Sequence, residues 1–203
     1  MGDDMKREWE VKKLGEVVDI INGRNQSKVI SEDGIFPIIG SAGKVMGYAT
    51  EYICEEGTTI IGRKGNISNP IYINESFWNV DTAFGIYPKH NYDTKFIHYL
   101  CLNIDFKSRN RGTTIPSLVK SDLVKIEIPF IDSITEQLRI VSILDKAFDA
   151  IDKAKQNAEQ NLNNAKELFE SYLQRVFEER GEGWEEKRLD EITDVKDGTH
   201  DSP

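Results

Sequence analysis

Residues 133–180 read, without a break, SITEQLRIVSILDKAFDAIDKAKQNAEQNLNNAKELFESYLQRVFEER. The stretch contains no Pro or Gly, is rich in Ala, Leu, Glu, Lys and Gln, and is followed by Gly181. This composition predicts one long helix that ends at the glycine. At about 1.5 Å per residue such a helix is roughly 70 Å long, which exceeds the width of a small domain.

Apolar side chains recur along this stretch at alternating steps of four and three residues. A 3.5-residue period is typical of a coiled-coil seam, and only Lys155 interrupts it. A single helix cannot bury its own stripe, and no other stretch of this chain is long enough to cover it. The predicted seam consists of Leu144, Phe148, Ile151, Ala158, Leu162, Ala165, Phe169, Tyr172 and Val176.

The residues before this helix predict a domain of about 130 residues in the α+β class. Short apolar segments bounded by turn residues are typical of strands, while residues 94–102 place their apolar side chains on one helical face. We therefore expect domain boundaries at 1–132, 133–180 and 181–203. The expected strands are residues 35–39, 45–48, 58–62, 71–73, 77–80, 83–87 and 123–128.

Composition and charge narrow the class of protein. Of the 203 residues, 38% are apolar and 30% are charged. No apolar run approaches the roughly 20 residues of a membrane span, and the polar N-terminus is unlike a signal peptide. Cys54 and Cys101 lie far apart in apolar surroundings, as buried thiols in a reducing compartment do. We expect a cytoplasmic protein.

The net charge of −9 is unevenly distributed. Residues 1–130 carry 16 basic and 17 acidic side chains, whereas residues 131–203 carry 10 and 18. An acidic helix beside a nearly neutral domain is compatible with a local nucleic-acid-binding patch. The alternative is a protein-interaction adaptor whose acidic helix docks partners.

A repeat links the two ends of the chain. Residues 9–16 read WEVKKLGE and residues 184–191 read WEEKRLDE, and the identities continue with Asp19 against Asp194 and Gly23 against Gly198. All of them fall at one constant offset of 175 residues. The repeat predicts that a second copy of the same domain begins at Trp184.

Motifs for catalysis and for cofactor binding are missing. The sequence has no phosphate-binding GxxxxGK, no dinucleotide-binding GxGxxG and no HExxH zinc motif, and its three histidines lack partners at motif spacing. We therefore expect no enzyme activity, no metal and no cofactor.

Polar, basic turns are the remaining chemical feature. Residues 62–66 place two cations between glycines, which suits a phosphate contact and equally suits a solvated hairpin turn. Residues 107–114 interleave three cations with Ser, Asn and Thr, without an acid, a set that contacts phosphates and base edges. Residues 23–28 and 41–44 are similar. The predicted DNA contacts are Arg63, Lys64, Lys107, Arg109, Arg111, Thr113, Arg24, Asn25, Gln26 and Lys44.

Several stretches, in this order, resemble the DNA-specificity (S) subunit of type I restriction–modification systems. They are residues 9–16, IIGRKGNI at 60–67, WNVDTA at 78–83, GTTIPSL at 112–118, IEIP at 126–129, EQLRIVSILD at 136–145 and DGTHDSP at 197–203. The family pattern is two target-recognition domains, each followed by a long helix, with the helices paired antiparallel. The resemblance implies a non-catalytic, sequence-specific DNA-recognition subunit that recruits methyltransferase (M) and restriction (R) subunits.

This chain departs from that pattern because it holds one domain and one long helix. An unpaired seam can be covered by a second copy across a two-fold axis. We therefore expect an antiparallel homodimer, with a recognition domain at each end and a palindromic DNA target. The alternative is an adaptor that pairs with full-length specificity subunits or with methyltransferase subunits without useful DNA binding of its own.

Overall fold

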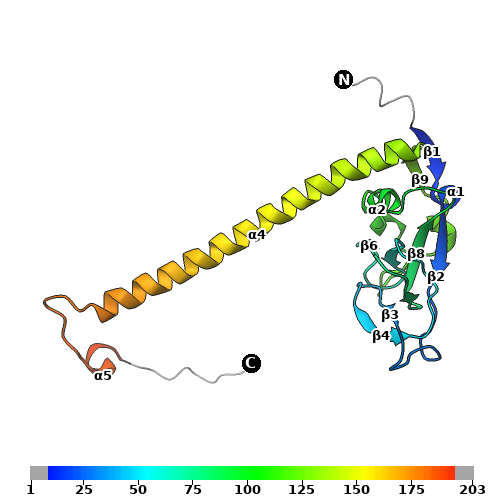
Figure 1. Ribbon diagram of the computed structural model, residues 1–203. Helices are drawn as coiled ribbons and strands as arrows, with labels where there is room; N and C mark the ends of the chain where they lie inside the picture. Colours follow the sequence, from blue (N-terminus) through cyan, green and yellow to red (C-terminus); the bar gives the residue numbers. More distant parts are fainter. Residues whose placement is uncertain (1–8, 195–203) are drawn as a thin grey trace, which may run out of the picture. The chain divides into compact units, whose positions relative to one another are not determined.

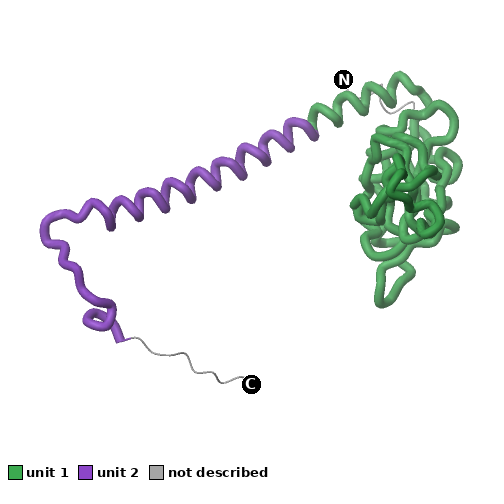
Figure 2. The backbone as a smooth tube through the Cα atoms, turned by 60° about the horizontal axis from the view of Figure 1, so that its bottom comes forward, with its two compact units in different colours: residues 1–147 green, residues 148–203 purple. Residues whose placement is uncertain are grey.

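A computed structural model describes residues 9–194 and divides the chain into two compact units, residues 1–147 and 148–203 (Figures 1 and 2). The predicted α+β class is confirmed. The elements are β1 (Glu10–Lys13), α1 (Leu14–Val17), β2 (Val18–Asn22), β3 (Phe36–Ile39), β4 (Val45–Ala49), β5 (Thr59–Gly62), β6 (Ile71–Tyr72), β7 (Trp78–Asn79), β8 (Ala83–Pro88), α2 (Thr94–Leu102), the 3-10 helix η1 (Lys107–Arg109), α3 (Lys120–Leu123), β9 (Glu127–Phe130), α4 (Ile134–Glu178) and α5 (Leu189–Ile192).

The strands of the first unit form three small sheets. The largest has the order β2-β8-β5-β6, and each neighbouring pair in it is antiparallel. A second sheet has the order β4-β3-β7, in which β3 and β7 run parallel. The third pairs β1 with β9, so that the first described strand lies against the strand that leads into the long helix (Figure 1).

The main core lies between the four-stranded sheet, helices α1 to α3 and the first turns of α4. Phe96 of α2 and Phe130 of β9 meet edge to face, with ring centroids 5.8 Å apart. Val141 of α4 is 7% exposed and belongs to the same cluster. The long helix is therefore anchored in the core of the domain that precedes it.

Most predicted elements of this unit appear within two residues of their expected bounds, but the strand predicted at 123–128 begins four residues later than expected, at Glu127. Its first residue closes helix α3, and the strand β9 starts only at Glu127 and continues through Pro129. The Val124 N–H donates to the Lys120 carbonyl at 3.1 Å, which keeps this part helical. Pro129 is tolerated because β9 pairs with β1 alone among the described strands.

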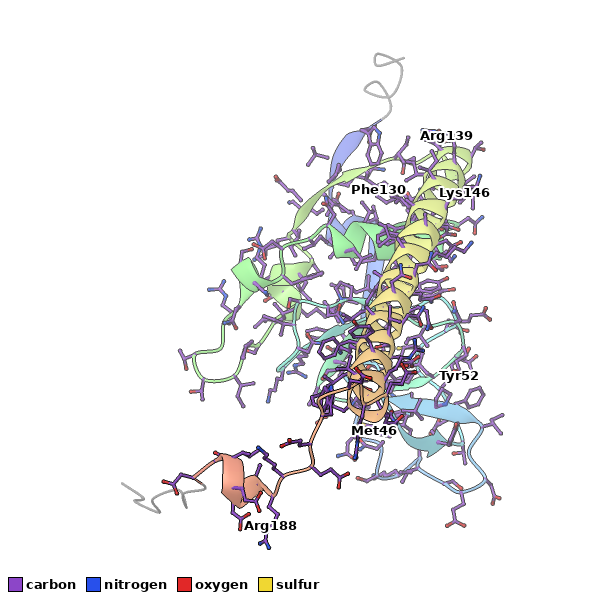
Figure 3. The ribbon with its side chains drawn as sticks, turned by 90° about the vertical axis from the view of Figure 1, so that its left-hand side faces the viewer. Met46, Tyr52, Phe130, Arg139, Lys146 and Arg188 are labelled. Carbon is purple, nitrogen blue, oxygen red and sulfur yellow. The ribbon has the colours of Figure 1, made fainter. Side chains whose placement is uncertain are left out.

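Helix α4 runs for 45 residues and its predicted seam is exposed along nearly its whole length. Leu144 is partly buried, and the other eight predicted seam residues are exposed. Phe169 and Tyr172, for example, expose 65% and 66% of their surface. Figure 3 shows the side chains of α4 standing out around the helix. In the described part of the chain, no helix combines the length and the apolar character that a membrane span requires.

The second unit contains a short copy of a structure seen in the first. Helix α5 lies 175 residues after α1, which is the offset of the sequence repeat. In both, the residue after the helix donates its N–H to the first helical carbonyl. Leu14 is fully buried, whereas its counterpart Leu189 is 65% exposed. The repeated residue Gly198 and the DGTHDSP stretch lie outside the described residues.

Candidate nucleic-acid interface

Three strand ends meet at one edge of the four-stranded sheet, and each carries a polar loop. Strands β2 and β5 both run antiparallel to β8, so their last residues lie opposite its start. Asn22 pairs with Phe84, and Gly62 pairs with Ala83. The basic loops after β2 and β5 therefore leave the sheet on either side of the turn that leads into β8.

That turn, residues 79–83, holds the first loop through its backbone. The Arg24 N–H donates to the Asn79 carbonyl at 2.8 Å. A Cβ atom at Gly23 would lie 1.7 Å from the Val80 carbonyl oxygen, so only glycine allows this approach. The side chains of Arg24 and its neighbours Asn25 and Gln26 are not needed for the attachment, and Arg24 is exposed.

The same turn holds the second loop. The N–H groups of Arg63 and Lys64 both donate to the Thr82 carbonyl, at 2.8 and 3.2 Å. Both side chains are exposed. The Arg63 guanidinium lies over the Phe84 ring, 5.7 Å from its centroid, which restrains it near the sheet edge.

The third basic loop, residues 110–118, follows Arg109 at the end of η1 and is attached to the second loop. The Leu118 N–H donates to the Arg63 carbonyl at 2.9 Å, and the Gly65 N–H donates to the Pro116 carbonyl at 2.8 Å. Gly65 has a φ of 81°, a conformation that favours glycine. Three loops that are far apart in the sequence thus form one surface, which we call the basic edge. It comprises Arg24, Asn25, Gln26, Arg63, Lys64, Arg109, Arg111 and Thr113.

A polar cavity of about 260 Å³ opens at the third loop. Within it, the Arg111 Nε donates to the Asp122 carboxylate at 2.8 Å. This hydrogen bond to Arg111 holds the pKa of Asp122 below its usual range. Residues 107–114 contain no acidic residue, but α3 places the Asp122 carboxylate beside them. The cavity is lined by Ser108, Arg109, Asn110, Arg111, Asp122 and Lys125.

The structure places the two remaining predicted contacts differently. Lys44 ends the turn between β3 and β4, which follows Ile39, and the Ile39 carbonyl accepts the Val80 N–H at 3.3 Å. Lys44 thus belongs to a turn of the second sheet and not to the three loops of the basic edge. Lys107 is exposed on η1 and does not line the cavity that holds Arg109. A DNA contact at any of these positions stays a prediction.

Sequence reasoning missed two charged residues of the cavity, Asp122 and Lys125. Asp122 lies in α3, just before the strand predicted at residues 123–128, and Lys125 lies within that predicted strand, where a charged side chain carries no functional signal. This part of the chain forms a helical turn, and Asp122 on that turn contacts Arg111 of the basic loop. Recognising a helix at Lys120–Leu123 is what would have revealed them.

One histidine and both cysteines of the first unit lie within the packed fold. Burial lowers the pKa of His98 to about 4 and raises the pKa values of Cys54 and Cys101 to about 12. His98 Nδ1 lies 3.3 Å from the Thr59 hydroxyl. Within residues 9–194, no three His, Cys or carboxylate side chains gather as metal ligands would.

Comparison with known proteins gives consistent matches. A family model described as the type I restriction modification DNA specificity domain matches residues 6–162. The type I restriction enzyme MjaIX specificity subunit of Methanocaldococcus jannaschii is 26% identical, and the match covers 96% of this chain and 54% of that protein. The MjaVIII specificity subunit of the same organism is 25% identical, covering 95% and 51%. The chain thus spans about half the length of these relatives.

Solved structures support the fold. A chain from a structure on complex assembly and conformational transition of the type I R-M system has a TM-score of 0.73 at 21% identity, covering 87% of this chain and 47% of that chain. The S subunit from M. genitalium has a TM-score of 0.59 at 19% identity, covering 84% and 46%. At these identities the likeness concerns the fold alone.

Proposed function

Because the chain belongs to the type I restriction modification DNA specificity family, we propose that it recognises one half of a split DNA target through the basic edge. The family that the sequence motifs indicate is confirmed. The two Methanocaldococcus jannaschii relatives are named specificity subunits, and we propose that non-catalytic role for this chain. The proposed subunit acts in the cytoplasm, on double-stranded DNA, together with methyltransferase and restriction subunits.

The observation that carries the proposal is the convergence of three basic loops at one sheet edge. Their backbones are held by hydrogen bonds to one another and to the turn at residues 79–83, so these attachments do not use the basic side chains. Arg, Asn, Gln and Thr on one surface supply both phosphate contacts and donors or acceptors for base edges. The net negative charge of the chain lies mostly after residue 130, where there are 18 acidic and 10 basic side chains, and therefore away from these loops in sequence.

A binding assay at several salt concentrations tests the proposal. Replacing Arg63 and Arg109 by Ala should weaken DNA binding and flatten its salt dependence, by about one unit of slope for each phosphate that is no longer neutralised. Replacing Lys166, an exposed cation of α4, by Ala is the matched control. Unchanged affinity and slope in the double variant would remove the basic edge from the interface.

We further propose that α4 pairs antiparallel with α4 of a second copy. The support is the apolar seam, which is exposed from Phe148 to Val176, and the lack of another long helix among the described elements to cover it. A two-fold axis would place one recognition domain at each end of the pair. The target would then consist of two inverted half-sites.

An adaptor role is the second candidate, favoured by the eight-charge acidic excess of residues 131–203. In that case the exposed seam pairs with a full-length specificity subunit or docks a methyltransferase subunit. Measuring specific DNA binding with and without a methyltransferase subunit separates the two. Specific binding by this chain alone favours the recognition role, and no specific binding in either condition favours the adaptor.

A further inference from the structure

The joint between the recognition domain and α4 is built around a buried amide. Gln137, in the first turn of the helix, has no exposed surface. Its Oε1 accepts the Asp93 N–H at 2.9 Å, and its Nε2 donates to the Ile131 carbonyl at 2.7 Å. Since Asp93 also caps α2 through the Phe96 N–H, this one side chain ties the start of α4 to the start of α2 and to the end of β9.

A second attachment lies two turns further along α4. The Asp145 carboxylate accepts the Lys95 ammonium at 2.8 Å and the Tyr99 hydroxyl at 2.5 Å. Lys95 and Tyr99 are four residues apart and share one face of α2. Between the two attachments, Val141 is buried in the core. The helix is thus held at two points about 12 Å apart along its axis.

The two attachments and the packing of Val141 together hold the first turns of α4 against α2 and the core. From Asp145 to Glu178 the helix continues for about 50 Å at about 1.5 Å per residue. A tilt of about 5° at the joint would move the far end by about 4 Å, more than the roughly 3.4 Å rise of one base pair. A small change in the angle between α4 and the recognition domain would therefore change the number of base pairs between the two half-sites that the dimer can bind.

We propose that Gln137 and Asp145 are positioning residues that set the spacing between the two DNA half-sites. This inference rests on the proposed function, in which paired α4 helices separate two recognition domains. Neither residue contacts DNA; both act by holding the direction of α4 against α2. Their replacement should change the tolerance for spacer length and leave the recognition of a single half-site intact.

The test uses the full 203-residue chain and duplexes with two inverted half-sites, which are first identified by wild-type selection from a random pool. The wild type should prefer one spacer length, and binding should weaken about tenfold when one base pair is added or removed. Asp145→Lys should reduce that preference to less than about threefold, with unchanged affinity for an isolated half-site. Lys146→Glu reverses the neighbouring exposed charge and is the matched control (Figure 3).

Rescue distinguishes positioning from general damage. The double variant Lys95→Glu, Asp145→Lys restores an ion pair of opposite polarity and should restore the spacer preference. Gln137→Met, which keeps the volume and removes both hydrogen bonds, should broaden the preference in the same way while the chain still recognises a half-site. An unchanged profile in both single variants, or broadening that the double variant does not rescue, overturns the inference. A wild type that selects half-sites without spacer preference also overturns it, and one that selects no half-site refutes the proposed function itself.

Discussion

Replacing Ile151 by Ala tests whether α4 pairs through its predicted seam. Ile151 is 59% exposed. Complete burial of such a side chain is worth about 1.5–3 kcal/mol, so covering the exposed part contributes about 1–2 kcal/mol. A symmetric dimer contains the residue twice, which brings the loss to about 2–4 kcal/mol. Since 1.4 kcal/mol corresponds to a factor of ten, the dimer dissociation constant should rise about 30- to 700-fold.

Ile143 provides a matched control on the same helix. It is 53% exposed, close to the value for Ile151, but it lies roughly 100° around the helix from the seam residue Leu144. Ile143→Ala should change the dimer dissociation constant by less than about threefold. Both variants remove the same side chain from similar surroundings, so the difference between them reports the position of the seam.

Sedimentation equilibrium over a series of concentrations measures both constants. Equal effects of the two substitutions would show that α4 associates without using the seam. A wild-type chain that remains monomeric at about 50 µM would refute the homodimer itself, because the exposed stripe offers ample apolar surface for association.

Three further predictions concern charge and burial. Asp122→Asn frees Arg111 and removes a negative charge from the cavity, so DNA affinity should rise and the salt slope should steepen; a lower affinity would show that the ion pair shapes the loop. The pKa of His98 is near 6.5 in the unfolded chain and about 4 in the folded protein. The free energy of unfolding should therefore fall by roughly 1–3 kcal/mol as the pH drops from 6.5 to 4. Thermal melts of His98→Gln should lose most of this pH dependence. Both thiols should resist alkylation at pH 8 until the chain is unfolded, since burial raises their pKa values to about 12, and rapid native labelling of Cys101 would contradict the packing around it.

The periodicity and composition of single stretches of sequence predicted the two longest described helices well. The long helix and the helix at residues 94–102 follow from periodicity and composition, and both appear within two residues of their expected bounds. The basic loops come together because β2 and β5 both pair with β8. In the β2–β8 pair, the paired residues lie 60 or more positions apart in the sequence, so no local pattern predicts this pairing. The partner of Arg111 escaped notice because it belongs to a helical turn hidden in an apolar stretch. Spacing along the chain indicates which residues are available for binding, and strand pairing decides which of them share a surface.

The backbone fastening of the basic edge has a consequence for evolution. The Asn25 side chain shapes its loop by accepting the Ser27 N–H at 2.8 Å, but the N–H groups of Arg24 and Lys64 attach their loops without using the two side chains. Exposed positions such as Arg24 and Lys64 can therefore be exchanged at a cost of about 0.5 kcal/mol or less in stability. Gly23, whose Cβ would collide with a carbonyl oxygen, cannot. If the basic edge reads DNA as proposed, a lineage can thus change its target by substitution at these exposed positions while the fold stays stable.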